Sequence, residues 1–255
     1  MRIKIEGLNI NYITEGSGPG VLLHHGWGAN IDTMMPKFNL LKNNFKVYAL
    51  DFPGFGESDE PNDVYGVYDY ARLTKSFIDC MGMEEVILIG HSFGGRVSIV
   101  LSSQYKEMVR KMVLIDSAGL IPKRGLKYYF KVYSFKTLRF LYNTLFFWKD
   151  KNERLESFYK KFGSKDYQDS SGIMRKILVK VVNEDLRPHL KEIESSTLLI
   201  WGDQDTATPL YMGKIMESEI KDSGLVVLEG AGHYSYLDDF RRFSIILKTF
   251  LLGGE

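Results

Sequence analysis

Short runs of apolar residues recur along the chain and alternate with segments of helical periodicity. The apolar runs cover residues 21–23, 47–50, 86–89, 112–115, 198–201 and 225–228. Continuous runs of this length are typical of strands that are covered on both faces, as in a parallel sheet. The segments with a helical pattern include 68–81, 92–104, 209–217 and 235–251. This alternation predicts an α/β fold built on a doubly wound, mostly parallel sheet.

The N-terminal residues follow a different pattern. Residues 2–6 and 9–14 alternate apolar and polar side chains on either side of Gly7-Leu8. A period of two across a glycine predicts an antiparallel hairpin. Together with the six apolar runs, the hairpin gives a predicted sheet of eight strands.

One region interrupts the rhythm, because no convincing strand is found between Ile115 and Leu198. Residues 121–190 instead have a helical, aromatic and basic pattern, and a structureless stretch of this length would be improbable in a compact domain. We predict a helical cap over 121–190, inserted into a core formed by residues 1–120 and 191–255. Most cap aromatics are expected to form the cap's own core, and a minority to line a pocket beneath it. These aromatics include Tyr128, Tyr129, Phe130, Tyr133, Phe135, Phe140, Tyr142, Phe146, Phe147, Trp148, Phe158 and Tyr159.

Composition limits the possible partners and the location of the protein. The chain has 255 residues and a net charge of +1, which argues against nucleic acid as the main partner. Its single cysteine, Cys80, cannot form an internal disulfide and is expected to be a buried thiol. The N-terminus lacks the apolar stretch of a signal peptide, and no run approaches the ~18 apolar residues of a membrane span. A cytoplasmic protein without a membrane partner is therefore expected.

Charge is unevenly distributed, because the predicted cap is basic. Twelve basic residues lie between 121 and 165: Lys123, Arg124, Lys127, Lys131, Lys136, Arg139, Lys149, Lys151, Arg154, Lys160, Lys161 and Lys165. The acidic residues of this stretch are Asp150, Glu153 and Glu156, with Asp166 just beyond it. Such a run can be an ordinary solvated helix face. It can also be a basic rim that concentrates anionic substrates, such as a carboxylated ester or an acyl-carrier protein. A protein partner is possible, but the sequence does not indicate one.

The segment Gly90-His91-Ser92-Phe93-Gly94 directly follows the apolar run 86–89. A strand that turns at once into a helix needs small residues on both sides of the bend, and the central serine is then held at a strained, exposed tip. The pattern nominates Ser92 as a nucleophile. The alternative is a glycine-rich turn with an incidental serine.

A serine hydroxyl needs an adjacent base and a group that orients the base. His233 follows the last apolar run, and Asp205 follows the run that ends at Trp201, so both are expected at the carboxyl edge of the sheet with Ser92. Asp203 competes with Asp205 for the acid's role. No residues show the spacing of metal ligands and no dinucleotide motif follows a strand, so no cofactor or metal is expected.

An acyl-transfer transition state also needs donors for a developing oxyanion. The backbone N–H of Phe93 is one candidate. The second is the N–H of Trp27, in a loop where Gly26 and Gly28 allow the backbone to approach a ligand. We expect Gly26, Trp27, Phe93 and Tyr234 to bind the substrate, which is a small molecule.

Together these motifs resemble those of the α/β-hydrolase family. The similarity rests on His25–Gly28, Asp51–Ser58, Gly90–Gly95, Gly202–Asp205 with Pro209, and Gly232-His233, and it spans about 21–116 and 197–250. The family's spacing from Gly202 favours Asp205 as the acid, although some members place it at the position of Asp116. The resemblance implies acyl transfer to water by Ser92 through an acyl-enzyme.

Subfamilies can be partly distinguished by single positions. Haloalkane dehalogenases and epoxide hydrolases of this family have an aspartate where Ser92 stands. Meta-cleavage carbon–carbon hydrolases usually have Gly-Pro-Gly and a tryptophan where this chain has Trp27-Gly28-Ala29 and Tyr234. The His25–Gly28 stretch is similar to the carboxylesterase that demethylates a pimeloyl carrier-protein ester and to cofactor-free perhydrolases. The prediction is a serine carboxylesterase; the alternatives are a carbon–carbon hydrolase and a slow-turnover signalling receptor.

Overall fold

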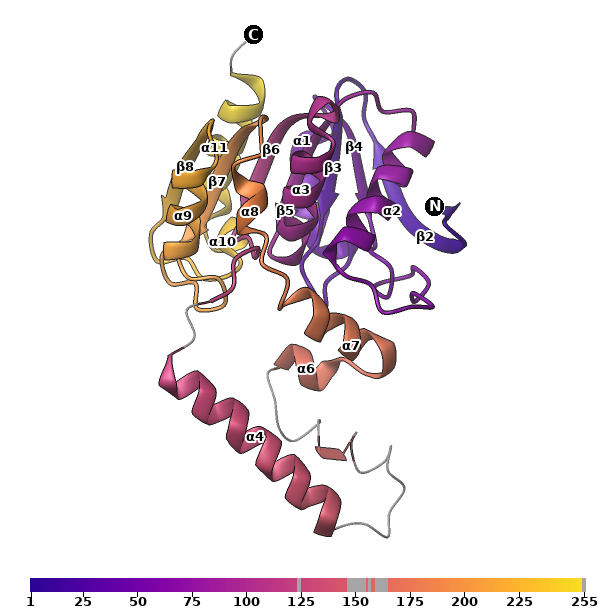
Figure 1. Ribbon diagram of the computed structural model, residues 1–255. Helices are drawn as coiled ribbons and strands as arrows, with labels where there is room; N and C mark the ends of the chain where they lie inside the picture. Colours follow the sequence, from indigo (N-terminus) through magenta and orange to yellow (C-terminus); the bar gives the residue numbers. More distant parts are fainter. Residues whose placement is uncertain (123–124, 146–154, 156, 159–164, 254–255) are drawn as a thin grey trace.

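A computed structural model describes residues 1–122, 125–145, 155, 157–158 and 165–253 of the chain (Figure 1). Its centre is an eight-stranded sheet with the order β1-β2-β4-β3-β5-β6-β7-β8. The strands are β1 Arg2–Ile5, β2 Leu8–Glu15, β3 Gly20–His24, β4 Lys46–Leu50, β5 Val86–His91, β6 Val109–Ile115, β7 Ser196–Gly202 and β8 Ser223–Leu228. β2 is antiparallel to β1 and β4, and every other pair is parallel. The predicted sheet is therefore confirmed, with each expected strand in place.

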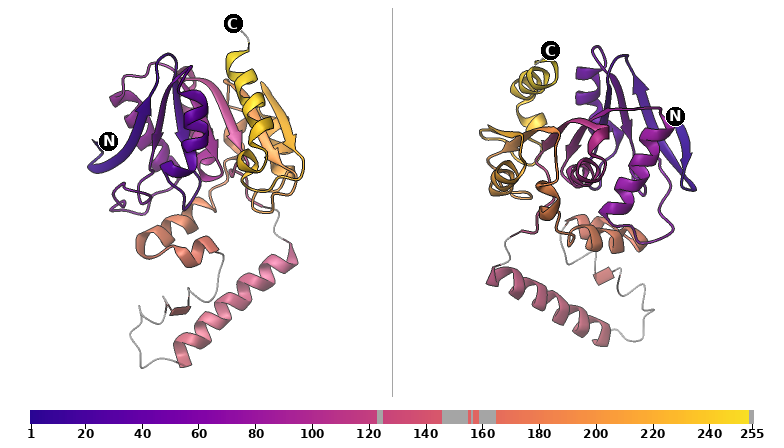
Figure 2. Two further views of the ribbon diagram at one scale, coloured as in Figure 1. Left: turned by 180° about the vertical axis from the view of Figure 1, so that it is seen from behind. Right: turned by 45° about the horizontal axis from the view of Figure 1, so that its top comes forward.

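Helices cover both faces of the sheet (Figure 2). In the core these are α1 Ile31–Leu41, α2 Val67–Cys80, α3 Phe93–Gln104, the 3₁₀ turn η1 Lys106–Met108, α9 Tyr211–Glu219, α10 Ser235–Asp238 and α11 Phe240–Leu252. Alternate residues of one strand enter two separate apolar clusters. In β5, Leu88 belongs to the cluster that includes residues of α2, α3 and α9, whereas Ile87 and Ile89 belong to the cluster that includes residues of α1 and α11. This two-sided burial explains why the central strands are apolar throughout.

Three details differ from the sequence-based expectation. The predicted helix 235–251 is divided into α10 and α11 at Asp239, whose side chain caps α11 by accepting a hydrogen bond from the Arg242 N–H. Helix α1 was not predicted, since Pro36 lies inside it and disfavours a helix on local grounds. The expected burial of Cys80 is wrong. This residue is the last of α2 and is exposed.

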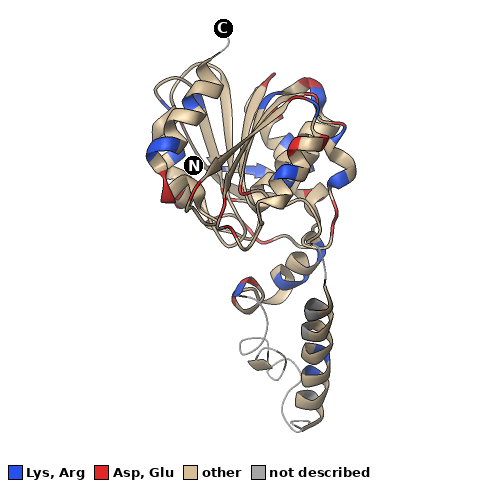
Figure 3. Ribbon diagram, turned by 90° about the vertical axis from the view of Figure 1, so that its left-hand side faces the viewer, with Lys and Arg blue, Asp and Glu red and all other residues tan. Residues whose placement is uncertain are grey.

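In the described part of 121–190 the regular elements are all helices. They are α4 Leu126–Leu145, α6 Lys165–Asp169, α7 Gly172–Val181 and α8 Arg187–Leu190. In Figure 1, α6 and α7 lie below the sheet, with α4 farther away. Helix α4 contains no acidic residue, whereas both signs of charge occur on the core (Figure 3). Among the described helices, none is long and apolar enough to cross a membrane.

Several residues of the predicted cap lie outside the described residues. These are Lys123, Arg124, Phe146, Phe147, Trp148, Lys149, Asp150, Lys151, Glu153, Arg154, Glu156, Tyr159, Lys160 and Lys161. The division into a cap of 121–190 and a core of 1–120 and 191–255 remains a prediction.

Candidate active site

Ser92 occupies a sharp turn between β5 and α3. Its backbone has φ 50° and ψ −111°, which is a strained conformation for a residue with a side chain. The turn also requires small neighbours. A Cβ on Gly90 would lie 2.6 Å from the carbonyl oxygen of Gly94, and a Cβ on Gly94 would collide with the backbone of His24. The glycines on either side of Ser92 thus allow the tight bend that the sequence motif predicts.

The strain at Ser92 predicts an increase in stability on substitution by glycine. The free energy of unfolding of Ser92→Gly should exceed that of Ser92→Ala by about 0.5–1 kcal/mol. Glycine adopts this backbone conformation without strain, and this gain exceeds its larger loss of chain entropy on folding. Urea unfolding of the two variants would measure the difference. Equal free energies of unfolding would show that the turn is not strained.

Three side chains from separate loops form a continuous hydrogen-bonded chain. The Oγ of Ser92 lies 3.0 Å from Nε2 of His233, and Nδ1 of His233 lies 2.8 Å from Oδ2 of Asp205. The three residues follow β5, β8 and β7, whose carboxyl ends meet at one edge of the sheet. The structure therefore brings together the serine, histidine and aspartate nominated from the sequence.

The surroundings of Asp205 hold it ionised and oriented. Its Oδ1 accepts hydrogen bonds from the N–H groups of Ala207 and Thr208, and its Oδ2 lies 2.6 Å from Thr208 Oγ1. Burial alone would raise the pKa of Asp205, but the bonds from His233 and Thr208 outweigh it and lower the pKa. Burial alone would lower the pKa of His233, but the bond to Asp205 outweighs it and raises the pKa. An ionised Asp205 accepts a hydrogen bond from the N–H at Nδ1 of His233, which leaves Nε2 unprotonated and able to accept a proton from Ser92.

The carboxylates of Asp203 and Asp116, the two alternatives to Asp205 as the acid, accept hydrogen bonds from other groups. Asp203 accepts a hydrogen bond from the N–H of Gly230 at 2.7 Å. Asp116 accepts from the N–H groups of Gly202 and Ser235, at 2.9 and 3.0 Å. Asp116 thereby ties the loop after β7 to the loop after β8, a role that the sequence did not indicate. Burial raises the pKa of Asp116 to about 7.

The loop after β3 lies directly beside Ser92. A Cβ on Gly26 would lie 3.4 Å from the Cβ of Ser92. His25 holds this loop, since its Nδ1 donates to the carbonyl of Gly26 at 2.7 Å and its Nε2 accepts from the N–H of Phe52 at 2.9 Å. Burial lowers the pKa of His25 to about 4, so the ring stays neutral and keeps both bonds.

Two backbone N–H groups near Ser92 are available to a ligand. Within the part of the chain that the structure describes, no acceptor is found for the N–H of Trp27. Phe93 is the first residue of α3, where an N–H has no partner inside the helix. These are the two donors nominated for an oxyanion.

Two other buried histidines of the site, His24 and His91, form hydrogen bonds to neighbouring protein groups. His24 bonds Ser98 Oγ at 2.9 Å, and Nε2 of His91 donates to the carbonyl of His233 at 2.8 Å. The His91 ring also lies 5.0 Å from the ring of His233. Burial lowers the pKa of His91 well below its ordinary value, so a neutral His91 supports the backbone of His233 from behind.

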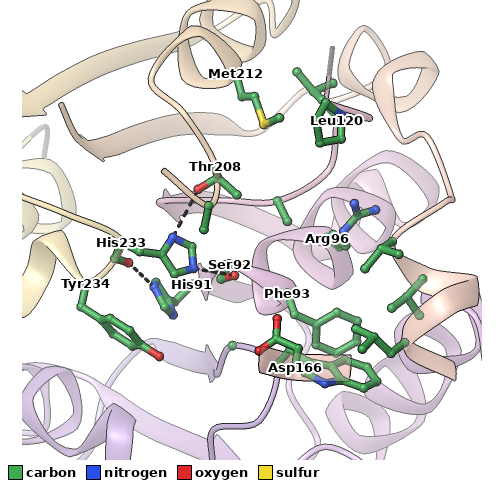
Figure 4. A pocket seen from close by; sticks show the side chains of 18 residues that line it. His91, Ser92, Phe93, Arg96, Leu120, Asp166, Thr208, Met212, His233 and Tyr234 are labelled. Carbon is green, nitrogen blue, oxygen red and sulfur yellow. Dashed lines mark hydrogen bonds between the residues drawn. The ribbon is translucent and has the colours of Figure 1, made fainter. Parts of the chain in front are cut away.

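Ser92 and His233 open into a cavity of about 340 Å³ (Figure 4). All four residues expected to bind substrate line it: Gly26, Trp27, Phe93 and Tyr234. Two charged residues that the sequence analysis did not nominate also line it, Arg96 from α3 and Asp166 from α6. Within the described residues no group of acidic, histidine or cysteine side chains has the arrangement of a metal site.

Comparison with known proteins agrees with this architecture. The model of the alpha/beta hydrolase fold family matches residues 19–240. The chain belongs to the α/β-hydrolase family. Over 258 residues this α/β-hydrolase is 28% identical to a 2-hydroxy-6-oxo-6-phenylhexa-2,4-dienoate hydrolase of Comamonas testosteroni, covering 92% of this chain and 90% of that protein. It is 26% identical over 250 residues to YugF, an uncharacterized hydrolase of Bacillus subtilis, covering 91% and 90%.

A solved bacterial membrane phospholipase A superposes on the α/β-hydrolase with a TM-score of 0.74 and 25% identity, over 99% of this chain and 85% of that one. Family and relatives together identify the protein as a hydrolase.

Proposed function

We propose that this α/β-hydrolase cleaves a small-molecule carboxylic ester through an acyl-enzyme. The observation that carries the proposal is the chain of hydrogen bonds from Ser92 through His233 to Asp205 at the cavity wall. A serine placed 3.0 Å from a histidine whose other nitrogen is bonded to a carboxylate is an activated nucleophile.

The proposed reaction has two halves. Ser92 Oγ attacks the ester carbonyl while Nε2 of His233 takes its proton, and Asp205 stabilises the resulting imidazolium. The N–H groups of Trp27 and Phe93 bind the oxyanion. His233 then protonates the departing alcohol, which leaves the acyl group on Ser92. Water loses a proton to His233 and attacks the acyl carbonyl, and the proton returns to Ser92 as the acid is released.

Carbon–carbon bond hydrolysis is the second candidate. It is favoured by the 28% identical relative, whose name describes the hydrolysis of a 6-oxo-dienoate. The ester proposal is favoured by the 25% identical phospholipase A, an enzyme class that cleaves esters. The residues Trp27-Gly28-Ala29 and Tyr234, which stand where meta-cleavage hydrolases usually have other residues, also favour an ester. Both reactions would use Ser92 and His233.

The discriminating experiment offers both substrates to the purified protein. We expect multiple turnovers of p-nitrophenyl esters with acyl chains of two to eight carbons, and little turnover of 2-hydroxy-6-oxo-6-phenylhexa-2,4-dienoate. Consumption of the dienoate alone would replace the ester proposal with the carbon–carbon reaction. A burst of one equivalent of nitrophenol followed by no further release would instead indicate the slow-turnover receptor.

A further inference from the structure

Arg96 is a buried cation in the wall of the cavity. It lies one helical turn after Ser92 on α3, is 4% exposed and lines the same cavity. Its Nη1 donates to the carbonyl of Glu184 at 2.8 Å, which accounts for one of its five N–H donors. Among the described residues no carboxylate pairs with Arg96 within 4.0 Å. Burying a guanidinium without an anionic partner is costly.

The nearest acidic side chains do not remove this charge. The carboxylate of Glu184 accepts a hydrogen bond from the N–H of Val67 at 2.7 Å instead of pairing with Arg96. Burial lowers the pKa of Arg96 to about 10, partly opposed by the charges of Glu184 and Asp185. The guanidinium therefore remains protonated near neutral pH and presents an unpaired positive charge to the cavity.

The second charge in the cavity wall has the opposite sign and a different position. Figure 4 shows the side chains of Arg96 and Asp166 at separate places in the cavity wall, with Asp166 beside the ring of Phe93. A bound anion would be attracted toward Arg96 and repelled from Asp166. The cavity wall thus carries a positive charge at Arg96 and a negative charge at a separate place, Asp166.

We infer that Arg96 is the subsite for a carboxylate on the acyl part of the substrate, so that the preferred substrates are esters whose acyl chain ends in a carboxylate. This inference rests on the proposed ester hydrolysis. Arg96 is four positions after Ser92, which corresponds to a rise of about 6 Å along a helix and suits a short chain between the scissile carbonyl and the anion. A guanidinium binds a carboxylate through two parallel hydrogen bonds, which would also fix the orientation of the acyl chain.

The test compares two esters of equal length, the mono-p-nitrophenyl ester of adipate and p-nitrophenyl hexanoate. We expect kcat/KM of the wild type to be at least about 10-fold higher for the adipate ester. Arg96→Gln retains a donor for the carbonyl of Glu184 but removes the charge. It should lower kcat/KM for the adipate ester by about 10- to 100-fold, the worth of a charge-assisted hydrogen bond. The value for hexanoate should change by less than about 3-fold, and Arg96→Lys should restore part of the preference.

Two further variants distinguish direct binding of the carboxylate by Arg96 from a general attraction of anionic substrates by positive charge. Lys176 is exposed on α7 and does not line this cavity, so Lys176→Gln removes the same charge and should leave the ratio of the two kcat/KM values unchanged. Asp166→Asn should raise kcat/KM for the adipate ester a few-fold by removing a like charge. An equal loss on both esters in Arg96→Gln would show that Arg96 has only a structural role, and would overturn the inference.

Failure of the inference can be distinguished from failure of the proposed function. Ser92-dependent turnover of hexanoate without a preference for the adipate ester would overturn the subsite and leave the esterase standing. If neither ester is turned over, the esterase proposal fails and calorimetry with adipate itself decides the subsite. Binding to the wild type that is lost in Arg96→Gln would support it, and absence of binding to the wild type would overturn it.

Discussion

Replacing Ser92 by alanine is expected to lower kcat for ester hydrolysis by about 10⁴- to 10⁶-fold, because the reaction then loses its proposed nucleophile and no acyl-enzyme can form. The residual rate would come from the N–H groups of Trp27 and Phe93 and from substrate binding alone. Steady-state kinetics on the best p-nitrophenyl ester, together with mass spectrometry for the acylated protein, would measure both effects.

The control for this variant is its fold. Within the described residues, the Oγ of Ser92 makes a single hydrogen bond, to His233, so its removal should leave the melting temperature within a few degrees of the wild type. Retention of more than a few per cent of the activity, in a preparation free of wild-type protein, would exclude Ser92 as the nucleophile.

Asp205→Asn is expected to lower kcat by about 10⁴-fold with little change in structure. An amide cannot hold the Nδ1 proton as the carboxylate does, so His233 no longer presents a free Nε2 to Ser92. The pH profile should change as well. Asp205 raises the pKa of His233 above its ordinary value of 6.5, and the protonated ring cannot act as a base. The rate of the wild type should therefore fall as the pH decreases through a pKa above 6.5, and this limb should move to lower pH in Asp205→Asn.

A neighbouring carboxylate provides the matched control. Asp203 lies two residues away and bonds the N–H of Gly230, so Asp203→Asn should keep kcat within a few-fold and leave the acid limb in place. An acid limb at the same pH in Asp205→Asn and wild type would mean that Asp205 does not set the pKa of His233.

The strands could be predicted because parallel strands are buried on both faces and must be apolar throughout. Val86–Ile89 and Leu198–Trp201 are unbroken apolar runs for this reason. Helix α1 could not be predicted in the same way, because Pro36 opposes it locally and the burial of Met34 and Phe38 against the sheet stabilises it. The apolar positions Ile31, Met34, Phe38 and Leu41 do have helical spacing, but the proline among them masks that signal.

The same contrast holds at the site. Ser92, Asp205 and His233 could be nominated because each follows a strand and the turn at Ser92 demands flanking glycines. The bonds that Asp116 accepts from Gly202, Thr208 and Ser235 join segments far apart in the sequence, so no spacing indicates them. The burial of Arg96 is likewise set by the segment around Glu184 and was visible only in three dimensions.

The position of β8 at the edge of the sheet has a consequence for biosynthesis. Ser92 precedes His233 by 141 residues, and His233 is carried by the loop after the strand that is synthesised last. A nascent chain emerging from the ribosome therefore holds an ordinary, unreactive alcohol at Ser92 until β8 has paired with β7. The time at which hydrolytic activity first appears during translation or refolding would therefore mark the pairing of β8 with β7. Activity can thus be used to follow the last step in forming the sheet.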